Sequence, residues 1–370
     1  MNGGSLLAAA DGKARGDDPL LQVLRMVAPG TELHEALEHI LRARTGALLV
    51  LADSDEVLSL VNGGFRIDAP LHPSALYELA KMDGAIVLSG DARRILFANT
   101  QLVPDPMIPS FETGTRHRTA ERVAKQTGAL VIAISQRRSV ITLYKGDLKY
   151  VVRDIGVLLA KANQALSTLD KYRAVLDQAL NNLSAVEFED LATLFDVTTC
   201  IQRAQMVARI GREIERYVAE LGTEGRLVSM QLEELMVDAK DEGPMIVRDY
   251  LVKSGDPEEA AKVWEAMMNL DADELLDHSL MARLLGYGTS GAASLDMPVT
   301  PRGYRVVRKI PRVPMPVIEN LVSVFKTLPA ILNASIEELD DVEGIGEVRA
   351  RAIKQGLNRL REQVLLDRHL

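Results

Sequence analysis

The 370-residue chain changes character once, near Arg153, and this change limits the folds open to it. Before that point, short apolar runs such as Ala47–Ala52 alternate with segments of helical periodicity, as in a sheet with helices on its faces. After it, from Ile155 to about Leu285, helical periodicity is almost uninterrupted and proline is scarce. We therefore expect an α/β amino-terminal domain, with a mixed or parallel sheet flanked by helices, followed by an all-α region.

Apolar runs bounded by turn residues predict the strands of the first domain. They lie at 47–52, 85–89, 95–99, 129–135, 140–144 and 148–152. Val61–Phe65 predicts a turn, and the proline-rich Pro104–Phe111 predicts a loop. In the second region, Ile155–Leu183 predicts one continuous helix.

Composition shifts divide the chain into five parts. We expect a flexible amino-terminal tail at 1–17, an α/β domain at 18–153, a helical region at 154–285, a Gly/Ser/Thr/Pro-rich linker at 286–301 and a last domain at 302–370. The last 70 residues hold 12 basic and 9 acidic side chains, a net of +3, whereas the whole chain carries −9. A nucleic-acid site would therefore be local to this end.

Composition also excludes several classes of protein. The single cysteine, Cys200, permits neither an internal disulfide nor a four-cysteine zinc site. Aromatic residues make up only 4% of the chain, which argues against binding single strands by stacking. We find neither a signal peptide nor a membrane-spanning run, so we expect a cytoplasmic protein that does not bind membranes.

The run Gly114–Arg122 has the composition of a phosphate site. Arg116, His117 and Arg118 stand between Thr115 and Thr119 at the start of an amphipathic segment. Thr115 is the expected helix cap, and the N–H groups after it would face an anion. Three basic side chains at a helix amino terminus are unfavourable against the helix dipole unless an anion binds there. A solvated basic turn is the alternative.

A second motif lies near the carboxyl end. Ser335–Leu339 opens a helix with a capping pattern, and two glycines around Ile345 then allow a tight turn into another helix. This resembles a helix-hairpin-helix element, which grips DNA phosphates without reading bases. A helix pair for protein contacts is the alternative. The expected DNA-binding residues are Gly344, Ile345, Gly346, Arg349, Arg351 and Lys354.

An upstream segment looks like a degenerate first half of the same motif. It has Arg312, Val313 and Pro314 where the Gly-x-Gly turn would stand, and Pro314 has no N–H to offer a phosphate. Basic residues cluster just before and within it, and a solvated basic strand is the alternative for them. The cluster consists of Arg302, Arg305, Arg308, Lys309 and Arg312.

Two signatures in the first domain resemble those of the diadenylate cyclase family. Asp83-Gly84-Ala85 matches its DGA motif, and Arg116-His117-Arg118, about 30 residues on, matches its RHR motif. A helical region and a terminal helix-hairpin-helix module, as here, are the arrangement of the DNA-scanning branch of that family. The similarity extends from about Pro19 to Leu360.

This resemblance implies an enzyme that joins two ATP molecules into cyclic di-AMP and releases two pyrophosphates. Asp83 then corresponds to the catalytic aspartate that helps hold Mg²⁺ or Mn²⁺; without the match it would read as a turn residue. The implied ATP-binding residues are Gly84, Ala85, Leu102, Thr115, Arg116, His117, Arg118, Thr119 and Ser135. The resemblance further implies a homo-octamer in which branched DNA, bound at the carboxyl end, reduces synthesis as part of a DNA-damage checkpoint.

Two rival functions remain from the sequence. The first is a non-catalytic DNA-scanning scaffold that binds ATP as a sensing ligand; intact Asp83 and the complete Arg-His-Arg run count against it. The second is a DNA nuclease or ligase, suggested by the hairpin. The sequence shows no nucleophilic lysine motif and no carboxylate cluster suited to two metals there.

Overall fold

A computed structural model describes residues 19–253, 255–288 and 295–367. The tail predicted at 1–17 lies outside the described residues, as do residues 289–294 of the predicted linker. The chain forms two compact units. One comprises the residues up to Asn163 with Glu215–Ser229, and the other comprises Gln164–Ile214 with the residues from Met230 onward. Within the described residues, no helix combines the length and apolar character needed to cross a bilayer.

The first unit is built on a mixed sheet. In the described chain it has eight strands, in the order β2-β5-β4-β1-β6-β7-β8, with β3 also paired to β5. β1 is parallel to β4, and the other pairings are antiparallel. The strands are β1 (Ala47–Leu51), β2 (Val61–Asn62), β3 (Phe65–Pro70), β4 (Ala85–Leu88), β5 (Arg94–Leu102), β6 (Leu130–Ser135), β7 (Val140–Lys145) and β8 (Leu148–Val151).

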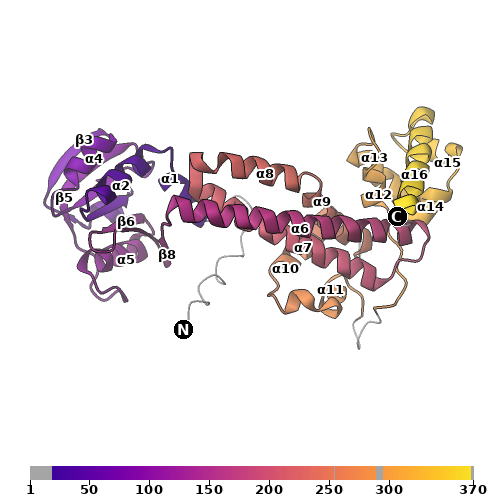
Figure 1. Ribbon diagram of the computed structural model, residues 1–370, viewed down its shortest axis with the longest axis horizontal. Helices are drawn as coiled ribbons and strands as arrows, with labels where there is room; N and C mark the ends of the chain where they lie inside the picture. Colours follow the sequence, from indigo (N-terminus) through magenta and orange to yellow (C-terminus); the bar gives the residue numbers. More distant parts are fainter. Residues whose placement is uncertain (1–18, 254, 289–294, 368–370) are drawn as a thin grey trace. The chain divides into compact units, whose positions relative to one another are not determined.

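Helices cover both faces of this sheet, as Figure 1 shows. Side chains alternate along β1: Leu49 packs with α1, α2 and α4, whereas Val50 packs with α3 and α5. The central strands are therefore apolar throughout, which is why they appear as continuous runs in the sequence. The helices are α1 (Pro19–Val27), α2 (Glu32–Arg42), α3 (Asp55–Leu58), α4 (Pro73–Leu79) and α5 (Thr115–Thr127).

The sequence prediction was right for the central strands and wrong for β3. The turn predicted at Val61–Phe65 is present at Gly63 and Gly64, which have positive φ, but the ends of that segment belong to β2 and β3, and β3 itself was missed. β3 lies at the edge of the sheet and is almost wholly exposed. An edge strand of this kind carries no buried apolar face, so its sequence lacks the pattern by which strands are recognised.

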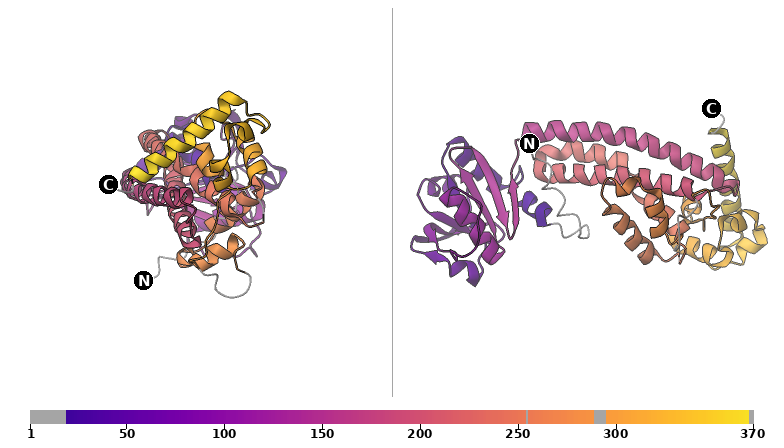
Figure 2. Two further views of the ribbon diagram at one scale, coloured as in Figure 1. Left: turned by 90° about the vertical axis from the view of Figure 1, so that its right-hand side faces the viewer. Right: turned by 90° about the horizontal axis from the view of Figure 1, so that it is seen from below.

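The all-α region was correctly predicted, and α6 is a single helix of 34 residues. Figures 1 and 2 show that, within the second unit, α6 from Gln164 and α7 up to Ile214 run side by side. Cys200 of α7 donates its thiol to the carbonyl oxygen of Ala179 in α6, at 3.2 Å. The elements are α6 (Ile155–Phe188), α7 (Leu194–Leu221), η1 (Gly222–Gly225), α8 (Arg226–Met236), α9 (Ala239–Tyr250), α10 (Pro257–Met268), η2 (Glu274–Leu276) and α11 (His278–Leu284).

The carboxyl-terminal helices share one core of aliphatic side chains, including Ile318, Leu321, Ile345 and Ile353. Phe188, the last residue of α6, and Met245 of α9 also pack against this core. The helical region and the last domain are therefore continuous within the second unit. The helices are α12 (Tyr304–Arg308), α13 (Met315–Phe325), α14 (Leu328–Asn333), α15 (Ile336–Asp340) and α16 (Glu347–Asp367).

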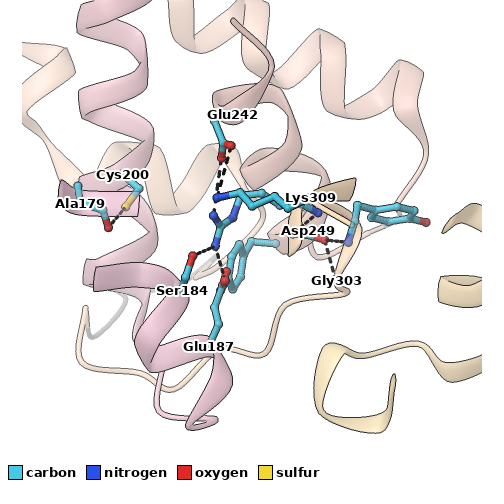
Figure 3. Close-up of polar contacts among 11 residues, drawn as sticks. Ala179, Ser184, Glu187, Cys200, Glu242, Asp249, Gly303 and Lys309 are labelled. Atoms are coloured by element: carbon cyan, nitrogen blue, oxygen red, sulfur yellow. Dashed lines mark hydrogen bonds and ion pairs between the residues drawn. The ribbon is translucent and has the colours of Figure 1, made fainter. Parts of the chain in front are cut away.

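A cluster of buried charged side chains connects the start of the last domain to the helical region (Figure 3). Arg305 of α12 is 2% exposed and forms an ion pair with Glu187 of α6, itself fully buried. Arg305 also donates to Ser184 Oγ at 3.0 Å and lies 3.6 Å from a Glu242 carboxylate oxygen. Sequence analysis listed Arg305 in a basic cluster, with a solvated strand as the alternative, and the structure instead buries it. The sequence could not show this, because its partner Glu187 stands 118 residues earlier in the chain.

Asp249 completes the cluster from α9. Its carboxylate accepts hydrogen bonds from the backbone N–H groups of Gly303, Tyr304 and Arg305, at 2.7–3.0 Å. Burial and the neighbouring Glu187 charge nevertheless raise the pKa of Asp249 to about 6. The first turn of α12 is therefore held at its amino end by a side chain of the helical region.

Replacing Arg305 tests the importance of this cluster. We expect Arg305→Met to lower the free energy of unfolding by about 3–5 kcal/mol, because Glu187 would remain buried without a counter-charge. The measurement is urea unfolding followed by circular dichroism. Adding Glu187→Gln should recover part of the loss, since glutamine can still accept from the Tyr250 hydroxyl, now 2.8 Å from Glu187. A loss below about 1 kcal/mol in the single variant would contradict this assignment.

Candidate functional site

The strand pairing brings one end of each of four strands, β1, β4, β5 and β6, to the same side of the sheet, here called the site edge. Leu49 of β1 lies opposite Ile86 of β4 in parallel, so the amino ends of both strands meet there. Ala47 pairs with Ile134, which brings the carboxyl end of β6 to the same edge. Antiparallel pairing of Ala85 with Thr100 adds the carboxyl end of β5. The predicted site residues Asp83, Gly84, Leu102 and Ser135 all stand at these ends.

The amino terminus of α5 reaches this edge as well. α5 ends at Thr127, directly before β6, and packs on the sheet through Ala120, Val123 and Ala124. It therefore runs antiparallel to β6, and its first turn lies over the end of that strand. The guanidinium of Arg116 confirms this placement, since it rests against Gly46, immediately before β1.

The cap of α5 differs from the prediction. Gly114, not Thr115, is the N-cap residue, with extended backbone at φ −84° and ψ 139°, and no side chain accepts from the first turn. Thr115 is instead the first helical residue. Glycine serves here because an N-cap needs a non-helical backbone but not a side chain. The first N–H groups of α5 thus remain available to an anion.

Gly46 is a site residue that sequence analysis missed. A Cβ atom on Gly46 would lie 2.1 Å from Arg116 Nη1, so only glycine leaves room for the guanidinium in this position. The one signal in the sequence is a glycine directly before a buried strand, which has many possible causes.

Glycine at position 84 is required by the fold itself. A Cβ on Gly84 would lie 2.4 Å from backbone atoms of Asn99, a β5 residue with φ +52°. Ala85 is buried in the sheet, and its carbonyl oxygen accepts from the Thr100 hydroxyl at 3.1 Å. These two residues therefore fix the backbone beside the exposed Asp83.

The surroundings of the His117 ring are formed by side chains that sequence analysis did not identify. Its half-buried ring meets the ring of Tyr144 edge-on, at 6.4 Å between centroids. The Tyr144 hydroxyl donates to Glu112 at 2.9 Å, and Lys149 forms an ion pair with the same carboxylate. Burial acts to raise the pKa of Glu112, but the hydrogen bonds from Lys149 and Tyr144 outweigh it and lower that pKa. The lowered pKa favours the anionic form of Glu112, whose charge acts on His117, one of the predicted phosphate-binding residues.

Burial lowers the pKa of His117, and although the Glu112 charge opposes this effect, the Arg116 and Lys149 charges add to it. A lowered pKa favours the neutral imidazole of His117 in the free protein.

The loop before α5 is tied down by that helix. Arg118 Nε donates to the Glu112 carbonyl at 3.2 Å, and Arg122 Nε donates to the Ile108 carbonyl at 2.9 Å. Gln126 accepts from the backbone N–H of Asp105 at 2.9 Å. Part of the basic character of this segment therefore serves the loop. Thr119 is half-buried one turn into the helix.

The residues at the site edge could hold a metal ion only together with ligands from a nucleotide. In the described part of the chain, no three histidine, cysteine, aspartate or glutamate side chains are grouped to hold a metal ion by themselves. Asp83 offers one exposed carboxylate. Magnesium in nucleotide sites is typically held by one or two carboxylates together with substrate phosphates, and Asp83 fits that pattern.

The helix-hairpin-helix element is present where the sequence predicted it. Gly344 has φ +82°, Ile345 is buried, and the predicted capping box joins Ser335 and Glu338. The cationic side chains differ in their availability. Arg349 donates to the Gly344 carbonyl and Arg351 pairs with Glu347, both on the exposed surface. The Lys354 ammonium is half-buried and donates to the carbonyls of Leu332 and Ala334, at 2.7 and 2.6 Å, so it closes the end of α14.

The upstream basic cluster does not form a free cationic surface. Besides the buried Arg305, Arg308 pairs with Asp241, and Lys309 lies 3.8 Å from Glu242. Arg302 donates to the carbonyls of Arg248 and Asp249. Within the described residues, Arg312 alone of the five makes no hydrogen bond or ion pair. Most of this positive charge therefore stabilises the join to the helical region.

Gly46→Ala tests the placement of Arg116. The methyl group would displace a flexible guanidinium, so the fold should persist while ATP affinity falls about tenfold, the value of one charge-assisted hydrogen bond. Isothermal titration with ATP measures the change. Gly90→Ala is the matched control, because a Cβ there finds 3.6 Å of room and Gly90 follows the opposite end of β4. Unchanged affinity in Gly46→Ala would remove Arg116 from the site.

Family models match all three regions of the chain. Residues 34–148 match the family model described as DisA bacterial checkpoint controller nucleotide-binding, and 152–294 match that of the DisA linker region. Residues 327–356 match the helix-hairpin-helix motif.

Relatives similar over nearly the whole chain carry one name. The DNA integrity scanning protein DisA of Symbiobacterium thermophilum is 60% identical over 94% of this chain and 98% of its own length. That of Carboxydothermus hydrogenoformans is 59% identical over 94% and 98%. That of Clostridium botulinum strain Langeland is 56% identical over 95% and 98%. The chain therefore belongs to the DNA integrity scanning protein DisA family.

Proposed function

We propose that the protein is a diadenylate cyclase that condenses two ATP molecules into cyclic di-AMP and two pyrophosphates, and that branched DNA bound at its carboxyl end regulates this synthesis. The observation that carries the proposal is that exposed Asp83 and the amino terminus of α5, to which no side chain supplies a capping hydrogen bond, lie at the same end of the strands. Matches to a DisA nucleotide-binding domain and a helix-hairpin-helix motif support the two halves.

The residues divide the chemistry between them. The 3′-hydroxyl of one ATP attacks the α-phosphorus of the other, an O–P bond forms, the bond to the β-phosphate oxygen breaks, and pyrophosphate leaves. Asp83 lies beside the attacking hydroxyl, polarises it and assists removal of its proton. Asp83 would hold Mg²⁺ or Mn²⁺ together with substrate phosphates, and the metal would supply charge neutralisation. In a second step of the same kind, the 3′-hydroxyl of the other ATP attacks the remaining α-phosphorus, which closes the ring and releases the second pyrophosphate.

The helix amino terminus and its side chains hold the triphosphate. The N–H groups of Thr115, Arg116 and His117, together with the Arg116 guanidinium, present fixed positive charge to the phosphate oxygens. Negative charge builds up on the departing pyrophosphate, so donors placed there favour the transition state over the bound substrate. Ser135 and Thr119 are further contacts, and Leu102 forms part of the adenine pocket.

One domain offers one Asp83, so the reaction needs two domains face to face. The loop before α5 supports such a meeting. Phe111 and Met107 are 92% and 84% exposed, and Val103 is also exposed at the end of β5. An apolar set of this kind is costly in water and would be covered by a second copy. We propose a homo-oligomer, an octamer in its complete form.

The alternative is a scaffold that binds ATP as a sensing ligand without turning it over. It shares the phosphate contacts of the cyclase but has no use for a carboxylate beside the ribose hydroxyl. The two functions therefore differ in what happens to ATP when Asp83 loses its charge.

Asp83→Asn separates them. We expect ATP to bind within about tenfold of the wild-type affinity while cyclic di-AMP formation falls at least about 100-fold, because a general base and metal ligand is lost. Product formation is followed by liquid chromatography, and binding by titration with the metal present. Asp147→Asn, the same charge change in the exposed β7–β8 turn, is the control. Wild-type turnover in Asp83→Asn would take Asp83 out of the mechanism.

A further inference from the structure

A cleft of about 810 Å³ lies where the degenerate first hairpin meets α9 and the start of α16. Arg308, Arg312 and Arg349 line it, against one acidic residue, Asp241, which is already paired with Arg308. The cleft therefore carries two net positive charges and favours an anion.

Apolar side chains also line the cleft. Half-buried Met245 and Met315, with exposed Pro311 and Pro314, form its accessible apolar wall, whereas Val313 and Ile318 are buried in the core. In paired duplex DNA the apolar faces of the bases are stacked inside the helix, and the backbone phosphates and sugars would gain little from such a wall. A nucleobase has an apolar face, and polarizable methionine sulfur and aliphatic groups pack well against it. The volume is within the range of about 300–1,000 Å³ found for small-ligand pockets.

The backbone of the first hairpin repeats that of the second. Arg312 has φ +66° and precedes a buried Val313, just as Gly344 has φ +82° and precedes a buried Ile345. A left-handed backbone suits glycine and is strained for arginine. The chain thus keeps a charged side chain where glycine would be unstrained, and Arg312 is the one of these positive-φ residues that lines the cleft.

The cleft is continuous with the second hairpin. Arg349 lines the cleft and donates to the Gly344 carbonyl of that hairpin. Asn320 of α13 donates to the neighbouring Glu343 carbonyl at 3.0 Å. Arg349 is therefore shared by the cleft and the second hairpin.

We propose that this cleft receives one unpaired nucleotide of branched DNA, with Arg312 binding its phosphate and the apolar wall holding its base. The first hairpin lacks the Gly-x-Gly amides, since Pro314 has no N–H, and it binds through a side chain instead. The inference rests on the proposed DNA-binding role of the domain and adds the feature of DNA that the domain selects. Unpairing a base at a branch point costs less than in a continuous duplex, which favours such sites.

The test compares two four-way junctions, one fully paired and one with an unpaired 2-aminopurine nucleotide at the branch point. Full-length wild-type protein should bind the second about tenfold more tightly and change its 2-aminopurine fluorescence. Arg312→Gly should lose that tenfold preference, bind the paired junction within twofold of wild type, and keep or raise the melting temperature because the backbone strain is relieved. The control is Arg359→Gln, which removes the same charge from an exposed side chain of α16 that does not line the cleft.

The outcomes separate the levels of the inference. Equal losses on both junctions in Arg312→Gly would overturn the nucleotide site and leave Arg312 an ordinary phosphate contact. Unchanged affinity for both junctions, or the same selective loss in Arg359→Gln, would also overturn it. Wild-type protein that binds neither junction would instead overturn the proposed DNA-binding role itself.

Discussion

The register of β1 between β4 and β6 is the constraint on which the candidate active site depends. β1 is parallel to one neighbour and antiparallel to the other, so two strands begin and one ends at the same edge. A shift by one residue would exchange the faces of a strand that is buried on both sides, and packing against α2 and α5 prevents this. Asp83, Ser135 and the first turn of α5 are brought together by that register, although 52 residues of sequence separate the first two.

Steric exclusion then refines the site. Two glycines, Gly46 and Gly84, matter for the atoms they admit: the Arg116 guanidinium in one case and the β5 backbone in the other. The anionic Glu112 accepts a hydrogen bond from Tyr144 and pairs with Lys149, so it places a fixed negative charge near His117. These contacts hold the charged side chains in place in the free protein, as the proposed binding of a triphosphate requires.

At the carboxyl end, positive charge has two distinct uses. Arg305 is buried to join the last domain to α6 and α9, whereas Arg312 is exposed beside a cleft. The two residues look alike in the sequence, and only their surroundings separate a structural arginine from a candidate DNA contact. The same holds for Lys354, whose helix position predicts DNA binding but whose ammonium binds two carbonyls.

Sequence alone predicted what depends on local pattern. The buried strands, the 34-residue α6 and the turn at Gly344 each follow from periodicity or from a glycine that a left-handed backbone requires. It failed where the cause lies far along the chain. The partner of Arg305 is in α6, Gly46 is defined by a helix 70 residues later, and exposed β3 has no core-facing pattern. The shift of the α5 cap to Gly114 shows the usual uncertainty of one residue at helix ends.

The most direct test of the central claim is mass spectrometry of the products formed when purified protein is incubated with ATP and Mg²⁺ or Mn²⁺, with and without a four-way junction. The account predicts cyclic di-AMP and two pyrophosphates per molecule formed, with a lower yield when the junction is present. ATP that remains bound but unconverted with either metal would contradict the cyclase and favour the nucleotide-sensing scaffold.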